Sequence, residues 1–298
     1  MTDVSKEKVA YRVSAVTIIA NTVLSVLKLI AGVFAHSSAM ISDALHSASD
    51  VFSTVIVILG IKLSSRESDK THPYGHERFE CVSAIVLSAV LCATGIGIGI
   101  AGIEKIASKE ELTAPGLAAL IAAAVSIAVK EIMYRYTASA AKKINSPSLK
   151  ADAWHHRSDA LSSVGSFVGI LGARLGLPIL DPIAAVVIAL LVVKAAIEIF
   201  SDAIGRMTDR ACDDETVKAI TETVASVDGV KSIDLLNTRV FGDKIYVDVE
   251  IGADENLSFK EVHDIAEEVH SKIEREHPNV KHCMVHANPV DPSERQII

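Results

Sequence analysis

Hydrophobic residues gather in six long runs along the first 200 residues of the chain. A helix needs about 20 mostly apolar residues to cross the hydrocarbon core of a bilayer. We therefore predict six transmembrane helices, at residues 11–35, 38–63, 79–104, 113–136, 151–174 and 178–202. None of them is expected to be a removable signal peptide, because the opening "MTDVSKEK" lacks a short apolar core and a small-residue cleavage site.

The pattern changes after residue 206. Strict alternation of apolar and polar residues in "YVDVEI" predicts a strand, and Ser258 with Glu261 forms a capping box at the start of an amphipathic helix. The order is helix, strand, strand, helix, strand, at residues 213–227, 231–242, 244–252, 258–276 and 279–289. We predict a ferredoxin-like α+β domain in which two helices cover one face of a sheet. The expected domains are 1–206, which transports, and 207–298, which binds metal and dimerises.

Composition and charge support this division. Half of the residues are hydrophobic and the mean hydropathy is +0.36, which is high for a water-soluble protein. Residues 201–298 hold 21 Asp and Glu against 11 Lys and Arg. An acidic domain of this kind argues against nucleic acid or an anionic lipid surface as its partner and is compatible with cations.

The distribution of Lys and Arg predicts the orientation. The N-terminal segment and the connections after the second and fourth spans carry eleven Lys and Arg, whereas the opposite connections carry three. Because positive loops stay on the cytoplasmic side, both termini are expected in the cytoplasm. The four cysteines show no C-x-x-C spacing and are interpreted as structural.

Two predicted spans carry a repeated polar motif. Residues 43–50 read "DALHSASD" and residues 152–159 read "DAWHHRSD", so each contains Asp, His and Asp at i, i+3 and i+7. This spacing places the three side chains on one helix face. An ionisable side chain at mid-membrane costs roughly 2.5–3.5 kcal/mol and persists only where a partner or cavity compensates. Local Asp–His pairing would explain one such motif, but two matching copies favour a shared site.

The two motifs lie on helices that run in opposite directions. If these helices pack together, His46 lies near Asp159 and Asp50 lies near His155. Two imidazoles and two carboxylates suit tetrahedral Zn²⁺, whereas Mn²⁺ and Mg²⁺ prefer a shell dominated by oxygen. Imidazole binds a metal only in its neutral form. The four residues are therefore expected to hold either a divalent cation or protons.

The connection between the second and third spans, "SDKTHPYGHERFE", has ligand spacing of its own. It contains Asp69, His72 and His76, and Pro73 and Gly75 interrupt any helix there. Two histidines and a carboxylate suffice for a metal with an open coordination position. The alternative is a charged loop with solvated histidines, because a short His cluster is weak evidence alone.

The C-terminal domain offers a third, weaker candidate. Asp234, Asp248, His263 and His286 could converge there, although histidines scattered over an acidic surface would look the same in the sequence. We find no Gly-rich phosphate loop and no nucleophile elbow in this domain. In the loop, "HERFE" lacks the second His of the H-E-x-x-H metalloprotease motif.

Six spans, the paired His/Asp motifs, "HPYGHERFE" and the α-β-β-α-β tail together resemble the cation diffusion facilitator family of divalent-metal transporters. The resemblance covers nearly the whole chain and implies a homodimeric, proton-coupled exporter. Its transport-site positions match His46, Asp50, His155 and Asp159, and its loop site matches Asp69, His72 and His76. The His at position 46 makes this chain resemble the zinc-selective members of the family.

The resemblance is less complete in the tail. The family's binuclear site there is His-rich, whereas two of its positions read Asp234 and Asp248 and an acidic one reads Asn288; His263 and His286 are kept. These departures imply weaker, single-ion binding that regulates transport.

The expected function is secondary active export of divalent cations from the cytoplasm in exchange for protons, by a multi-pass protein of the inner or plasma membrane. Zn²⁺ is the expected substrate and regulatory ligand, with Cd²⁺, Co²⁺, Fe²⁺ and Mn²⁺ as further candidates. The expected partners are these ions, protons, the bilayer and a second copy of the chain, and no nucleic acid. A membrane-embedded metalloenzyme and a metal-selective channel are the alternatives; strong ligands argue against fast conduction, and we expect no enzyme activity.

Overall fold

The computed structural model describes residues 3–34, 38–108, 117–175, 177 and 179–291, with the side chains of residues 31–49 and of some other helical positions outside the description. The chain divides into two compact units, Met1–Ile204 and Gly205–Ile298. Each unit has its own hydrophobic core.

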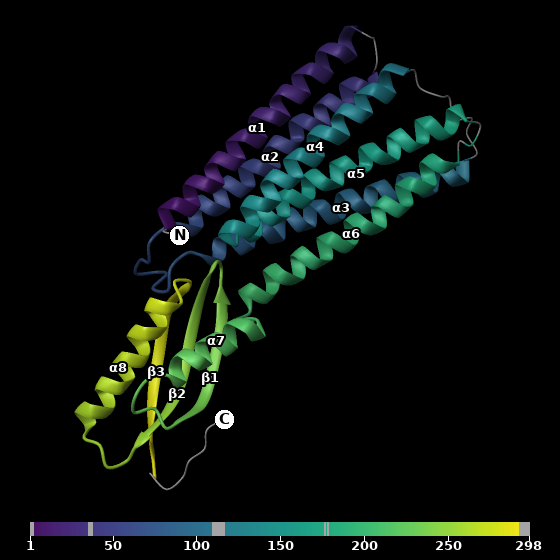
Figure 1. Ribbon diagram of the computed structural model, residues 1–298. Coiled ribbons are helices and arrows are strands. Elements are labelled where there is room, and N and C mark those ends of the chain that lie inside the picture. The colour runs from purple at the N-terminus through teal and green to yellow at the C-terminus, as the bar shows by residue number, and fades with distance from the viewer. Residues whose placement is uncertain (1–2, 35–37, 109–116, 176, 178, 292–298) are drawn as a thin grey trace. The chain divides into compact units, whose positions relative to one another are not determined.

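Six long helices form the first unit (Figure 1) and confirm the six predicted helices. Their bounds are α1 Asp3–Phe34, α2 Ser38–Ser64, α3 Arg78–Ser108, α4 Leu117–Ile144, α5 Pro147–Arg174 and α6 Leu180–Met207. In two of them, Lys6–Leu27 and Arg78–Glu104, the described residues are long and apolar enough to cross a membrane by composition alone. By contrast, α5 carries Asp152, Arg157 and Asp159 within about two turns.

Helix α5 begins earlier than its apolar run predicts. Ser146 acts as the N-cap, because its Oγ accepts a hydrogen bond from the Leu149 backbone N–H at 3.2 Å. Pro147 follows at the first helical position, where its missing N–H costs nothing. Asn145, just before, has a φ of 55° and turns the chain between α4 and α5. The hydroxyls of Ser146 and Ser148 both donate to the buried carboxylate of Glu80 at the start of α3.

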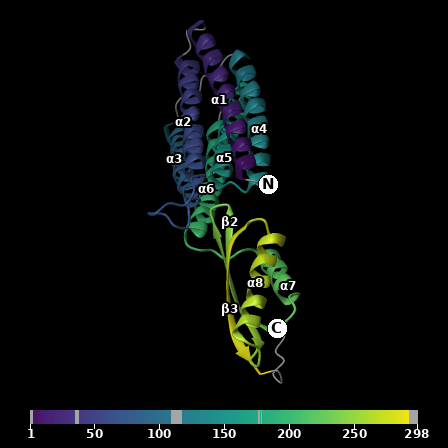
Figure 2. The same cartoon turned by 90° about the vertical axis from the view of Figure 1, so that its left-hand side faces the viewer.

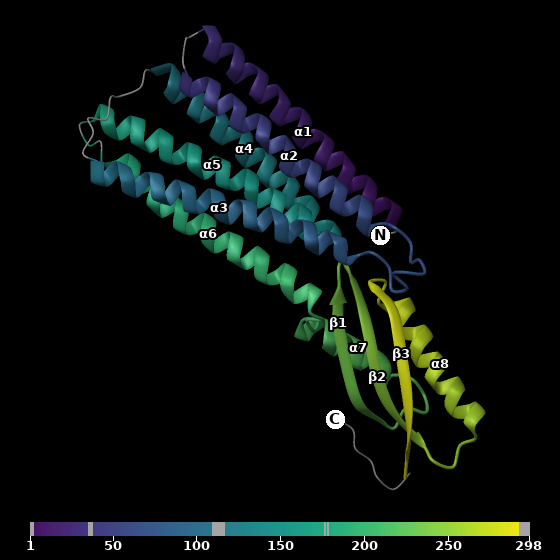
Figure 3. The ribbon, with the colours of Figure 1, turned by 180° about the vertical axis from the view of Figure 1, so that it is seen from behind.

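Two close helix contacts depend on glycine. A Cβ on Gly60 of α2 would lie 2.0 Å from the Ser83 hydroxyl of α3, and one on Gly95 of α3 would lie 2.9 Å from a methyl of Val193 in α6. Figures 1 and 3 show α3 and α6 side by side along much of their length. Small residues at such positions let backbones approach and gain van der Waals contact, which is the main source of helix association in lipid.

Large apolar side chains cover the outer surface of this unit. Ile19, Ile103 and Leu190 are each about 60% exposed or more (63%, 59% and 68%), although they lie on three different helices. A water-soluble unit rarely exposes so many large apolar side chains. This surface is the one expected of a bundle surrounded by hydrocarbon.

The second unit confirms the predicted α-β-β-α-β order. Its elements are α7 Asp214–Ala225, β1 Ser232–Phe241, β2 Lys244–Asp254, α8 Phe259–Glu276 and β3 Val280–Val290. The capping box at the start of α8 is also confirmed: Ser258 Oγ accepts from the Glu261 N–H, and the Glu261 carboxylate accepts from the Ser258 N–H at 2.8 Å. Strands β1 and β2 form an antiparallel hairpin, and β3 pairs parallel to β2 after the α8 crossover.

The two faces of this sheet differ. Val247, Val249 and Ile251 of β2 point into the core, where they meet Ile220 of α7 and Ile273 of α8. Figure 2 shows both helices on the same side of the sheet. The alternate residues of β2 and β3 therefore form an open face that neither α7 nor α8 covers.

Cys283 belongs to the covered face and provides a test of this packing. Burial, with a smaller effect from the nearby Glu274 and Asp248 carboxylates, raises the pKa of its thiol to about 12. We expect alkylation of Cys283 at pH 8 to be roughly a thousandfold slower than that of a free cysteine, since only the thiolate reacts. Mass spectrometry of iodoacetamide-treated protein measures it, with the partly exposed Cys212 as internal comparison. Labelling of Cys283 as fast as in denatured protein would contradict the packing.

Candidate metal centres

Three potential ligands from two helices meet inside the first unit. Asp50 of α2 and His155 and Asp159 of α5 each offer one ligand atom, and these atoms all lie within 4.8 Å of one another. The three residues are buried, with exposures of 2%, 6% and 7%. We call them the helix cluster. His155 Nε2 lies 3.4 Å from Asp50 Oδ1 and 3.4 Å from Ser53 Oγ.

The spacing of these residues along the chain explains why their ligand atoms lie close together. His155 and Asp159 are four residues apart and so lie on one face of α5, one turn from each other. Asp50 reaches them because α2 packs against α5. An aspartate pair with an imidazole supplies the borderline donor set that Zn²⁺ and other first-row divalent ions accept.

His46, the fourth predicted ligand, belongs to α2, but its side chain lies outside the described residues. It precedes Asp50 by four residues, which is one helical turn. The position of its imidazole relative to the helix cluster therefore stays a prediction. Asp43, on the same helix, is outside the description for the same reason.

Lys130 of α4 completes the helix cluster and was missed by sequence reasoning. Its Nζ lies 2.5 Å from Asp50 Oδ2, 2.8 Å from Asp159 Oδ2 and 3.1 Å from the amide oxygen of Asn21 in α1. The side chain is only 3% exposed. An ammonium has three N–H donors, and these three acceptors use all of them. The available signal was a lysine within a predicted apolar span, where an ionisable residue is a candidate for function.

A second buried pair lies one turn away on α5. His156 Nε2 is 3.6 Å from Asp152 Oδ2, and both side chains are fully buried. Asp152 Oδ1 also lies at the limit of hydrogen bonding, 3.5 Å, from the Thr54 hydroxyl. Asp152 is thus paired locally, and it is not among the residues that meet at the helix cluster.

In the loop between α2 and α3, the residues of the second predicted ligand set lie close together. Asp69, His72 and His76 also bring one ligand atom each within 4.8 Å of one another, and we call them the loop cluster. His76 is buried, whereas Asp69 and His72 are exposed. The two imidazole rings lie 4.5 Å apart, and the His76 ring stacks on Phe79.

Hydrogen bonds fix the chemistry of this loop cluster. Asp69 Oδ1 accepts from the Thr71 hydroxyl and from the backbone N–H groups of Thr71 and His72, at 2.6, 2.8 and 2.7 Å. The Thr71 hydroxyl bond first, and then the His72 backbone bond, hold the pKa of Asp69 far below its usual range. Its carboxylate therefore stays ionised at physiological pH. The stability that these bonds add is present above the ordinary Asp pKa of about 4 and is lost only as the pH falls towards the lowered value.

His76 is oriented for a cation. Its Nδ1 lies 3.1 Å from the backbone carbonyl oxygen of Glu67, and because a carbonyl can only accept, Nδ1 is the protonated nitrogen. In the neutral ring, Nε2 then presents a lone pair to Asp69 Oδ2, 3.4 Å away. Two lone pairs that face each other need a proton or a metal ion between them. A backbone carbonyl that fixes the tautomer of a ligating histidine is a common feature of metal sites.

The C-terminal residues do not form such a cluster within the described part of one chain. Asp248 and His286 lie on the open face of the sheet, where the β2–β3 register places Glu250 beside His286. Asp234 lies at the bulge of β1, and its Oδ2 accepts from the Asn288 amide at 2.9 Å. His263 is on α8, an element that covers the opposite face, and its ring lies 6.3 Å from that of Phe259. The fold thus separates His263 from the other three.

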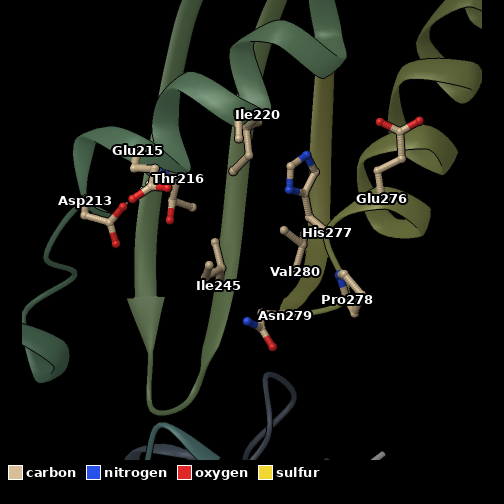
Figure 4. A pocket seen from close by; sticks show the side chains of 11 residues that line it. Asp213, Glu215, Thr216, Ile220, Ile245, Glu276, His277, Pro278, Asn279 and Val280 are labelled. Carbon is tan, nitrogen blue, oxygen red and sulfur yellow. Dashed lines mark hydrogen bonds between the residues drawn. The ribbon is translucent and has the colours of Figure 1, made fainter. Parts of the chain in front are cut away.

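A pocket of about 380 Å³ lies elsewhere in the second unit, between the start of α7 and the turn from α8 to β3 (Figure 4). Asp213, Glu215, Glu276 and His277 line it. His277 Nε2 lies 2.9 Å from the Thr223 hydroxyl. None of the predicted ligands of any site lines this pocket, so it does not coincide with the metal chemistry.

These features define a helical membrane protein that presents buried potential metal ligands between its helices and carries a separate α+β domain. Comparison with known families agrees: residues 14–207 match the cation efflux transmembrane domain, and residues 212–290 match the cytoplasmic domain of cation efflux proteins. The chain therefore belongs to the cation diffusion facilitator family, whose members are membrane-embedded transporters that carry divalent metal cations out of the cytoplasm.

Similar proteins are found in archaea and bacteria. The chain is 37% identical to an uncharacterised transporter of Methanocaldococcus jannaschii over 275 residues, covering 92% of this chain and 96% of that one. It is 34% identical to the manganese efflux system protein MneS of Bacillus subtilis, covering 93% and 94%. It is 31% identical to the manganese efflux system protein MneP of the same organism, covering 95% and 97%.

The loop cluster yields a direct test of metal binding. Replacement of Asp69 by asparagine removes the charge but keeps an oxygen that can accept from Thr71. We expect at least a tenfold loss of Zn²⁺ affinity, because an ionised oxygen ligand is lost. Isothermal titration of the purified protein measures it, in an Asp159→Ala background that disables the helix cluster.

The matched control is Glu67→Gln, which neutralises an exposed carboxylate of the same loop whose side chain is not part of the loop cluster. Equal affinities for the Asp69→Asn and Glu67→Gln variants would mean that the loop attracts cations by general charge and not by ligation.

Proposed function

We propose that this chain is a secondary active exporter that exchanges cytoplasmic Zn²⁺ for protons at His46, Asp50, His155 and Asp159. The observation that carries the proposal is the buried convergence of Asp50, His155 and Asp159, from two helices, within 4.8 Å. Ligands on different helices allow a small relative movement of those helices to change access to the ion. This is how membrane carriers open a central site alternately to each side.

Proton coupling follows from the chemistry of the ligands. His155 must be neutral to bind a metal through a ring nitrogen, and protonated carboxylates no longer neutralise a cation. Metal and protons therefore compete for one set of atoms. When the site opens to the more acidic outer side, protons displace the metal from its ligands. The carrier then returns to the cytoplasmic side with these protons bound.

The choice of Zn²⁺ rests on the nitrogen ligands. Two imidazoles with two carboxylates form a borderline, four-coordinate set that favours Zn²⁺ over Mn²⁺, which prefers oxygen. Manganese is the second candidate, because the Bacillus subtilis relatives are named as manganese efflux proteins. The nitrogen donor at His155 supports Zn²⁺, and the side chain of His46 decides how strong that preference is.

The remaining parts have regulatory and assembly roles in this proposal. Residues 1–206 carry transport with both termini in the cytoplasm, and residues 207–298 form a cytoplasmic domain that joins two copies of the chain. Asp234, Asp248 and His286 lie on or beside the open face of the sheet, where a second copy could complete a site for regulatory metal that one chain leaves dispersed. His263, on α8, would then contribute from another surface. The loop cluster, Asp69, His72 and His76, binds a further cytoplasmic ion.

Flux measurements test the exchange. In proteoliposomes with an imposed pH gradient, the wild-type protein is expected to transport Zn²⁺. Asp159→Ala is expected to reduce that flux at least a hundredfold, since it removes a ligand and leaves Lys130 with one carboxylate. The control is Asp202→Ala, which removes a partly exposed aspartate that pairs with Lys150 at 3.4 Å; such pairs contribute at most about 1 kcal/mol. Full flux through Asp159→Ala would disprove the assignment of the site.

Selectivity tests the role of His46. His46→Asp is expected to raise the ratio of Mn²⁺ to Zn²⁺ transport by roughly tenfold, because it replaces a nitrogen by an oxygen ligand. Competition of each metal with labelled Zn²⁺ in the same vesicles measures the ratio. His72→Asp, the same change in the loop cluster, is the control and should leave the ratio unchanged. An unaltered ratio in His46→Asp would show that position 46 does not select the metal.

A further inference from the structure

Lys130 raises a problem for metal binding, because it holds the carboxylates that a metal would need. Its ammonium lies 2.5 Å from Asp50 and 2.8 Å from Asp159, so both carboxylates already have a cation as partner. A Zn²⁺ ion binds carboxylate oxygens at about 2.0–2.2 Å, so it would compete with the ammonium for the same two carboxylates. It would also bring two further positive charges within a few ångströms of the ammonium. At so short a distance and in a buried site, this repulsion is strong.

We infer that Lys130 is an internal competitor of the transported metal: its ammonium pairs with Asp50 and Asp159 whenever the metal has left, and it moves aside when the metal binds. This inference rests on the proposed function and deepens it, because it assigns a positioning role to a residue outside the predicted ligand set. The ammonium supplies one of the two positive charges that leave with the ion, and the exchanged protons of the proposed function supply the rest. A carrier without metal therefore does not leave two unpaired carboxylates in the low dielectric of the bundle.

A polar face of α1 lies beside the Lys130 ammonium. Asn21 of α1 already accepts one of its N–H groups at 3.1 Å. Ser14 and Thr17 continue a polar face of α1 at helical spacing, and all three side chains are fully buried. Helix α1 packs against α4. A lysine has a flexible four-carbon stem with rotatable donors, and the bond to Asn21 gives its head a polar partner when it turns away from the carboxylates.

A purely structural role makes a different prediction. If Lys130 only held α4 to α2 and α5 through hydrogen bonds, a neutral donor would replace it well. If its charge competes with the metal, any neutral residue should tighten metal binding and hinder the return of the metal-free carrier. Two neutral variants therefore separate these roles. Lys130→Gln keeps hydrogen-bonding capacity, and Lys130→Met keeps only the length of the side chain.

The experiment compares two kinds of flux in proteoliposomes that contain the full chain. Net uptake of labelled Zn²⁺ into metal-free vesicles requires the carrier to return without metal, whereas tracer exchange at equal Zn²⁺ on both sides does not. In both neutral variants we expect net uptake to fall at least tenfold, exchange to stay within about threefold of wild type, and the half-saturating Zn²⁺ concentration for exchange to fall at least tenfold. Lys142→Met, an exposed lysine of the same helix, is the matched control and should behave as wild type.

Other outcomes overturn the inference in distinguishable ways. Equal loss of net uptake and exchange, an unchanged half-saturating concentration, or rescue by glutamine but not by methionine would show that Lys130 is structural. If Lys130→Met does not yield folded protein, Lys130→Gln alone decides between these results. Wild-type protein that moves Zn²⁺ in neither assay would overturn the proposed function itself, and with it the role of Lys130.

Discussion

The buried ion pairs between Lys130 and the carboxylates of Asp50 and Asp159 are the interaction on which the first unit depends. They join α4 to α2 and α5 at residues that are 7% exposed or less. Removing one partner of such a group leaves an uncompensated buried charge, which costs about 3–5 kcal/mol. The same pairs lie beside His155, so the interaction that stabilises the bundle also holds the residues that we propose as metal ligands. Under that proposal, stability and transport depend on the same atoms.

The sequence predicts a large part of this arrangement, and the physical reasons are specific. Apolar runs of bilayer length locate the six helices, and alternation in β2 locates the sheet, because both patterns follow local periodicity. Asp50, His155 and Asp159 were predictable because helical spacing and antiparallel packing place them at one depth. The start of α5 was missed by four residues, because its signal lies in Ser146 and Pro147 and not in hydrophobicity.

What the sequence does not predict depends on which helices become neighbours. Lys130 was visible as a charge within an apolar span, but only the packing of α4 against α5 and α1 shows that it contacts Asp50, Asp159 and Asn21. The tail illustrates the opposite case. Asp248 and His263 were grouped from the order of the elements, yet α8 covers the face of the sheet opposite to the one that carries Asp248. Periodicity places a residue on a face but does not state which element covers that face.

The order of synthesis gives the Lys130 ion pairs a consequence for biogenesis. Asp50 emerges from the ribosome 80 residues before Lys130, and Asp159 follows 29 residues after it. At about 5–20 residues per second, α2 waits roughly 4–16 s for its counter-ion. A lone aspartate costs about 2.5–3.5 kcal/mol in a membrane helix, so α2 enters lipid as an incomplete part of the bundle. The helix therefore reaches its full stability only after α4 has been made.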